Sequence, residues 1–176
     1  MRNIAKGCDN VNTAAGRKSL AHRRNARYNG PAVVCMRASR FEQGFDKEAT
    51  KVRLHWLGHV PFEDAANIGV WAEQHGYTVT NTPLYTGASL PKIEEIDALA
   101  IMGGPMNVCQ HRDYPWLLAE KRFIERAISA RIPTIGICLG AQLVADVLGA
   151  KVIQNPHIEI GWFTVETVTE SPAGAE

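Results

Sequence analysis

Short apolar runs alternate with amphipathic stretches from Lys51 to about residue 168, and this alternation constrains the fold more than any other feature of the sequence. Such alternation is typical of βαβ units built around a parallel sheet. Parallel strands need crossover connections, which place helices on the faces of the sheet. We therefore predict an α/β fold with three layers, in which a mostly parallel sheet lies between helices.

Turn residues and helix-capping residues divide this region into elements. A first helix is expected after Asp64 as N-cap, and a long helix is expected to begin at Pro115. The long helix should direct Glu120 and its charged neighbours into water, because its apolar residues share the other face. The expected strands are Val52–Leu57, Tyr77–Thr80, Ala98–Met102, Thr134–Ile137, Val152–Ile153 and Trp162–Val168.

The charge distribution separates the first 50 residues from the rest. Residues 1–53 hold 12 Lys and Arg against 4 Asp and Glu, although the whole chain has a net charge of only +1. Residues 1–50 have few large apolar side chains and no sustained helical or strand period, so they cannot offset the entropy of ordering. We expect a basic, disordered segment at 1–50 and a domain at 51–176.

Two other interpretations compete with a disordered tail or translated sequence upstream of the true start. The segment could be an organelle-targeting presequence, or a nucleic-acid contact through Arg23, Arg24 and Arg27. No aromatic platform accompanies these arginines, so nucleic-acid binding is not expected. No apolar run is long enough for a membrane span and no secretory signal is visible, so we expect a cytoplasmic protein without a membrane partner.

The four cysteines lie far apart and form no C-x-x-C pair. This spacing argues against a zinc site and against a disulfide framework, so we expect thiols and no metal ion. The sequence indicates no cofactor. The histidines His22, His55, His59, His75 and His111 lack a motif context and are expected at the surface or in loops.

The segment from Pro133 to Gln142 contains an apolar strand, a G-x-C-x-G turn and the start of a helix. In a nucleophile elbow, flanking glycines prevent clashes in a cramped turn and the reactive side chain projects above the sheet. Gly136 and Gly140 occupy the flanking positions around Cys138. The N-terminus of the following helix favours thiolate over thiol, so Cys138 is the candidate nucleophile.

An acyl-transfer site also needs hydrogen-bond donors for the developing oxyanion. The backbone N–H of Leu139 is one candidate, and the Gly103-Gly104 turn after a neighbouring strand is the other. The carboxyl ends of parallel strands lie at one edge of the sheet, so these loops are expected to meet. The alternative is that Cys138 is only a small buried residue at a tight turn.

Five segments follow one another in a distinctive order: Gly103-Gly104-Pro105-Met106, Tyr114-Pro115-Trp116-Leu117, Gly136-Ile137-Cys138-Leu139-Gly140-Ala141-Gln142, Leu148-Gly149-Ala150 and Glu159-Ile160-Gly161-Trp162. They resemble successive motifs of class I (triad type) glutamine amidotransferases, most of all the free-standing proteins related to the amidotransferase domain of GMP synthase. The resemblance covers residues 52–168 and implies a flavodoxin-like sheet.

The resemblance implies that the protein hydrolyses the side-chain amide of glutamine and supplies ammonia to a synthetase partner or another acceptor. Cys138 would attack the amide carbon, and the N–H groups of Gly104, with Gly103 in the same turn, and of Leu139 would hold the oxyanion. Gln142 would contact the bound glutamine, although it could also be an ordinary polar residue of a helix. A γ-glutamyl thioester would form and then be hydrolysed.

The sequence departs from the family pattern at the catalytic base. In the family this base is the histidine of a His-x-Glu sequence that follows the Glu-Ile-Gly-Trp segment, and no histidine occurs among the 19 residues from Ile158 to Glu176. His157 and Glu159 imitate the pair but lie just before Gly161-Trp162, where the family chain enters its next strand, so a loop role is expected for His157. We therefore expect a domain incomplete at the C-terminus, from a fragment, truncation or frameshift, with impaired activity.

Two alternatives to a glutamine amidotransferase stay open at the level of sequence. One is a different cysteine hydrolase on the same flavodoxin-like scaffold. The other is a non-catalytic binding module that retains the fold. The ammonia acceptor, the partner and the oligomeric state are not encoded in any visible motif.

Overall fold

The computed structural model describes residues 51–154, 156, 161–162 and 164, together with the backbone of residues 27–28 and 33–36. Its main sheet has five strands in the order β2-β6-β5-β3-β4. These strands are β2 (Val33–Met36), β3 (Arg53–Gly58), β4 (Thr78–Pro83), β5 (Ala98–Ile101) and β6 (Thr134–Ile137). The four strands from β3 to β6 are mutually parallel, and β2 pairs with β6 in the antiparallel direction.

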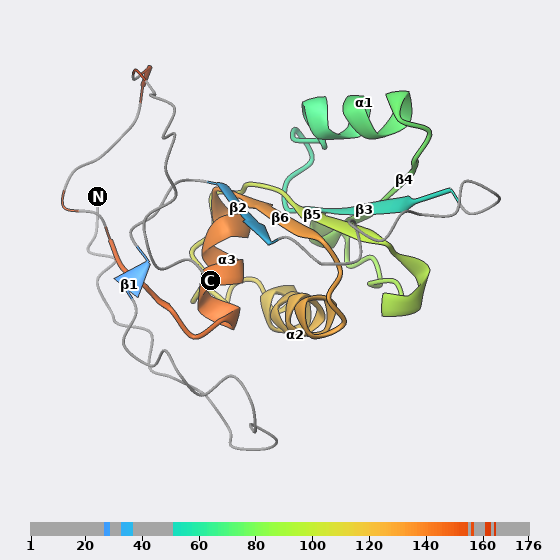
Figure 1. Ribbon diagram of the computed structural model, residues 1–176. Coiled ribbons are helices and arrows are strands. Elements are labelled where there is room, and N and C mark those ends of the chain that lie inside the picture. Colours follow the sequence, from blue (N-terminus) through green and yellow to red (C-terminus); the bar gives the residue numbers. More distant parts are fainter. Residues whose placement is uncertain are drawn as a thin grey trace, which may run out of the picture.

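The helices cover both faces of this sheet. Figure 1 shows α1 (Ala66–Gln74) on one face and α2 (Trp116–Ser129) with α3 (Leu139–Val147) on the other. Two short 3-10 helices, η2 (Leu84–Thr86) and η3 (Ile93–Glu95), lie between β4 and β5, and β7 (Lys151–Val152) pairs with β1 (Arg27–Tyr28) in a separate parallel ribbon. The predicted three-layer, mostly parallel α/β fold is confirmed.

Strand β5 lies in the middle of the sheet, and every one of its residues is buried. Leu99 and Ile101 belong to the larger core under α2 and α3, whereas Ala98 and Ala100 belong to the smaller core under α1. A parallel strand covered on both faces has this continuous apolar sequence. The register places Leu57 of β3 opposite Ile101, so both strands end at the same edge of the sheet.

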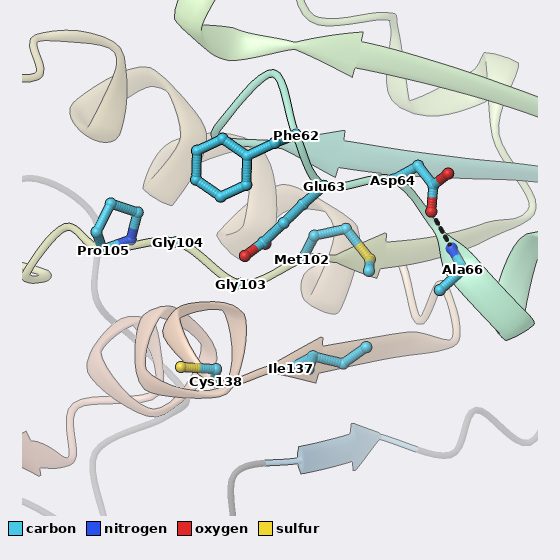
Figure 2. A pocket seen from close by; sticks show the side chains of 10 residues that line it. All are labelled: Phe62, Glu63, Asp64, Ala66, Met102, Gly103, Gly104, Pro105, Ile137 and Cys138. Atoms are coloured by element: carbon cyan, nitrogen blue, oxygen red, sulfur yellow. Dashed lines mark hydrogen bonds between the residues drawn. The ribbon is translucent and has the colours of Figure 1, made fainter. Parts of the chain in front are cut away.

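Local predictions differ from the structure at a few positions. Strand β6 has the predicted bounds. Strand β4 runs to Pro83, beyond the predicted end at Thr80. The sequence did not predict this part because β4 is an edge strand whose exposed residues lack an apolar pattern. The N-cap of α1 is Ala65, and Asp64 acts one residue earlier through its Oδ1, which accepts the N–H of Ala66 at 2.8 Å (Figure 2).

Two predictions about polar residues are wrong. Glu120 does not face water, because its side chain is fully buried between α2 and the end of β3, where it contacts His59. His55 is neither at the surface nor in a loop, because it lies in β3 and is only 4% exposed. His59 does lie in the loop after β3, but it is buried, with an exposure of 1%. His55 is satisfied by the hydroxyls of Thr80 and Thr82 on the adjacent strand, at 2.8 and 2.9 Å.

The cysteine prediction is partly wrong as well. Cys138 is a free thiol, but Cys109 is disulfide-bonded. A single bridge between distant positions leaves no spacing signal of the kind that identifies a disulfide framework. Because Cys138 is free, this bridge does not involve the candidate nucleophile.

The division into segments 1–50 and 51–176 stays a prediction. Strand β2 lies within the first of these segments, and its backbone pairs residue for residue with β6. Within the described part of the chain, no helix is long and apolar enough to cross a membrane.

Candidate active site

Cys138 occupies a strained backbone position between β6 and α3. Its φ of 51° and ψ of −108° lie in a region that residues other than glycine rarely adopt. The side chain is exposed, so the thiol is not sealed in the core. Strain at an accessible nucleophile is the arrangement expected of an elbow.

The two flanking glycines permit this bend through close backbone packing. A Cβ on Gly136 would lie 2.5 Å from the carbonyl carbon of Gly140, and a Cβ on Gly140 would lie 2.2 Å from the carbonyl oxygen of Ile101. No side chain fits at either position. Strand β6 can therefore turn sharply into α3, and α3 can approach β5, only because both residues are glycine.

The Gly103-Gly104 turn follows β5 and lies beside the elbow. A Cβ on Gly103 would be 3.7 Å from the Cβ of Cys138, and a Cβ on Gly104 would be 3.1 Å from the Cδ2 of Leu139. Among the described residues, no hydrogen bond uses the backbone N–H of Gly104 or of Leu139. Both donors are thus available to a ligand.

A cavity of about 720 Å³ opens between the elbow, the glycine turn and the loop before α1. Figure 2 shows Cys138 below and the Gly103-Gly104 turn above it, with Glu63 reaching toward the turn from the loop. The lining residues are Phe62, Glu63, Asp64, Ala66, Met102, Gly103, Gly104, Pro105, Ile137 and Cys138. The cavity thus combines one free thiol, a glycine turn and two carboxylates.

Only some of the predicted site residues line the cavity. Cys138, Gly103 and Gly104 line the same cavity, as the sequence predicted. Leu139 packs against the glycine turn, is only 1% exposed and does not line the cavity. Gln142 is partly buried on the first turn of α3, where its N–H bonds the carbonyl of Cys138 at 3.1 Å, and it does not line the cavity.

A buried ionic pair lies directly behind the glycine turn, and sequence reasoning missed it. His59 contacts the carbonyl oxygen of Gly103 through Nδ1 at 2.7 Å and the Oε1 of Glu120 through Nε2 at 2.8 Å. Burial lowers the pKa of His59, but the Glu120 carboxylate, the Gly103 carbonyl and the charge of Glu63 prevail and raise it. The sequence offered one signal for this pair: Glu120 follows Trp116 by one helical turn, so the two side chains lie on the same face of the helix.

Two further chemical features bear on this site. No described side chain makes a hydrogen bond to the Cys138 thiol, and His157 and Glu159 lie outside the described residues. Within the described ranges, no group of three or more His, Cys, Asp or Glu residues is arranged to hold a metal ion. The site as described therefore contains an exposed thiol and two backbone N–H groups without a hydrogen-bond partner among the described residues.

The comparisons with known proteins agree with this geometry. Residues 66–171 match the family model described as "Glutamine amidotransferase class-I". The chain belongs to the class I glutamine amidotransferase family. The match includes the elbow, the Gly103-Gly104 turn and Glu120, whereas His59 precedes it.

Named relatives of this amidotransferase domain include free-standing and GMP synthase proteins. It is 40% identical over 124 residues to the glutamine amidotransferase-like protein YfeJ of Salmonella typhimurium, covering 68% of this chain and 52% of that protein. It is 36% identical over 104 residues to the glutamine-hydrolysing GMP synthase of Phenylobacterium zucineum, covering 59% of this chain and 17% of that protein.

Solved structures show the same fold. A glutamine amidotransferase from Methylobacillus flagellatus superposes with a TM-score of 0.57 at 32% identity, over 64% of this chain and 44% of that one. One from Thermotoga maritima gives a TM-score of 0.55 at 30% identity, over 57% and 44%. The chain thus spans about half the length, or less, of the relatives it matches.

Proposed function

We propose that the protein hydrolyses the side-chain amide of glutamine through a thioester on Cys138. The observation that carries this proposal is the cavity shared by an exposed, strained cysteine and the Gly103-Gly104 turn. Family membership supports the reaction, and the relatives described as glutamine-hydrolysing GMP synthases support glutamine as the substrate.

The proposed reaction begins when the Cys138 thiolate attacks the amide carbon. The oxyanion that forms accepts hydrogen bonds from the N–H groups of Gly104 and Leu139, which no described residue otherwise engages. The C–N bond then breaks, the nitrogen takes up a proton and ammonia leaves. Water cleaves the γ-glutamyl thioester and yields glutamate.

The charge of the cavity suits an amino acid. Glu63 lines the cavity, and its Oε2 lies 3.3 Å from the position of a Cβ on Gly103. We propose that this carboxylate holds the α-ammonium group of glutamine. The Glu63→Gln variant should then raise the KM for glutamine and leave kcat nearly unchanged, because the contact is equal in ground and transition states.

The proposed reaction needs a general acid that protonates the leaving nitrogen. Among the described residues, no side chain makes a hydrogen bond to the Cys138 thiol that would identify such a group. A missing general acid-base typically costs about 10²- to 10⁴-fold in rate. We propose impaired hydrolysis by this chain, with ammonia passing to a synthetase partner or another acceptor.

The decisive assay measures ammonia release from glutamine by the wild type and by Cys138→Ala. Release that depends on Cys138 supports the proposal. Asparagine, whose side chain is one methylene shorter, serves as the control substrate. Saturable binding of glutamine without any release would instead identify a non-catalytic binding module, which the unbonded thiol also favours. Cysteine-dependent hydrolysis of other esters or amides, but not of glutamine, would identify a different hydrolase and overturn the proposal.

A further inference from the structure

His59 and Glu120 form a buried pair whose hydrogen bond to the candidate site, among the described residues, goes to the backbone carbonyl of Gly103. His59 follows β3 and Gly103 follows β5, and these neighbouring strands end together. Trp116 and Glu120 lie one turn apart on α2, and both contact the imidazole. The ring of Trp116 stacks on it with 5.5 Å between the ring centroids, and Glu120 bonds its Nε2. The ring is therefore held from two sides.

The hydrogen bonds of His59 determine where its protons lie. The carbonyl oxygen of Gly103 can only accept, so Nδ1 must carry a hydrogen. The Nε2 contact with Glu120 then shares one proton between imidazole and carboxylate. Both side chains are fully buried, so water does not compete for this hydrogen bond.

The bond to the Gly103 carbonyl also fixes the orientation of the next N–H. The chain has no cis peptide among the described residues, so the carbonyl of Gly103 and the N–H of Gly104 point in opposite directions across one planar unit. Since the carbonyl points at His59, the Gly104 N–H points away from it. A flipped peptide would instead present a carbonyl oxygen to the oxyanion.

The glycine turn needs such an anchor. Two consecutive glycines have no side chains to hold them and more backbone freedom than any other pair. A catalytic donor is effective only when it is oriented before the reaction begins. The pair also carries a cost, because the Oε2 of Glu120 is buried without a partner in the described structure, and such an exception calls for an explanation.

We propose that His59, held by Glu120, is a positioning residue that orients the Gly103–Gly104 peptide so that the Gly104 N–H faces the Cys138 cavity. This inference rests on the proposed function. His59 does not touch the substrate and acts only through the peptide. It therefore affects reactions that build negative charge on a carbonyl oxygen, and it leaves simple alkylation of the thiol unchanged.

The test compares two thiol reagents on the full chain. One is a glutamine analogue in which a chloroketone replaces the amide, so that its carbonyl oxygen occupies the oxyanion position while the thiolate displaces chloride. The other is iodoacetamide, which loses iodide without needing the oxyanion donors. The ratio of the two rates reports the donors separately from thiol exposure.

Two substitutions separate the hydrogen bond from the packing. His59→Phe keeps a ring beside Trp116 but has no donor, whereas the amide nitrogen of His59→Asn can replace Nδ1. Removing one oxyanion donor typically costs about 10²- to 10³-fold. We expect the chloroketone rate of His59→Phe to fall at least roughly tenfold, with most of it regained in His59→Asn and iodoacetamide rates within about threefold.

His55→Asn is the matched control, because it changes another buried histidine, four residues earlier in β3, whose hydrogen bonds go to Thr80 and Thr82. It should lower stability without changing the ratio. An unchanged ratio in His59→Phe, or an equal fall with both reagents, would overturn the positioning role. A wild type that shows no preference for the glutamine analogue would instead overturn the proposed function, and the positioning role with it.

Discussion

Replacing Gly140 by alanine should disrupt the elbow, because Gly140 is where α3 packs against the backbone of β5. The new Cβ would lie 2.2 Å from the carbonyl oxygen of Ile101 and 2.8 Å from its carbonyl carbon. Ordinary contacts are about 3.5 Å, so α3 would have to retreat from β5 by roughly 1 Å. The obstacle is the backbone of the central strand, which no side-chain rotation can relieve.

The expected loss of stability follows from this geometry. Overpacking a core costs about 1 to 3 kcal/mol, and an immovable backbone favours the upper end. Alanine recovers about 0.5 to 1 kcal/mol of helix propensity, which leaves a net loss of about 2 kcal/mol. Retreat of the helix would also move Cys138 away from the Gly103-Gly104 turn.

Urea denaturation measures this loss as a lower midpoint at unchanged slope. The control is Gly69→Ala on α1, where the nearest atom to the new Cβ is the Ala65 Cβ at 3.2 Å and alanine favours the helix. Gly69→Ala should be neutral or slightly stabilising. If Gly140→Ala denatured at the same urea concentration as the wild type, the close approach of α3 to β5 would be refuted.

Three further predictions concern the elbow and the buried histidines. Cys138→Gly should unfold at a higher temperature than Cys138→Ala, because only glycine adopts a φ of 51° without strain; equal melting temperatures would contradict the strained elbow. Burial lowers the pKa of His55 from 6.5 to about 4, so its stabilisation is complete above pH 6.5 and is lost as the pH falls toward 4. Urea titrations should show a slope of up to about 1.4 kcal/mol per pH unit in that window, and His55→Asn should remove it. Burial lowers the pKa of His59, but Glu120, the Gly103 carbonyl and the charge of Glu63 together raise it, so its stabilisation is complete below pH 6.5 and is lost as the pH rises through the raised pKa; His59→Phe should abolish that alkaline loss, and an unchanged loss would argue against the pair.

The parts of the site that sequence predicted correctly are encoded locally. The elbow was visible because Gly136, Cys138 and Gly140 must follow one another at fixed spacing between a strand and a helix. The meeting of Gly103 with Cys138 followed from a general rule, since parallel strands end at one edge of the sheet. Neither inference required knowledge of tertiary contacts.

The parts that were missed depend on partners distant in the chain. Glu120 lies 61 positions from His59, and a carboxylate in an amphipathic helix is ordinarily assigned to the solvent face. Only the arrival of His59 from the end of β3 gives it a buried partner. The bridge of Cys109 was missed for the same reason, because no local spacing announces it.

The unpartnered carboxylate oxygen of Glu120 limits how this scaffold can be engineered. Replacing a buried ion pair by apolar residues of similar volume often gains about 1 to 4 kcal/mol. A selection for thermal stability alone would therefore replace His59 and Glu120 by apolar residues. The selected protein would be more stable, but its glycine turn would lack the hydrogen bond from His59. Ranking variants by melting temperature would thus work against reactivity, as stability and activity often oppose each other at functional sites.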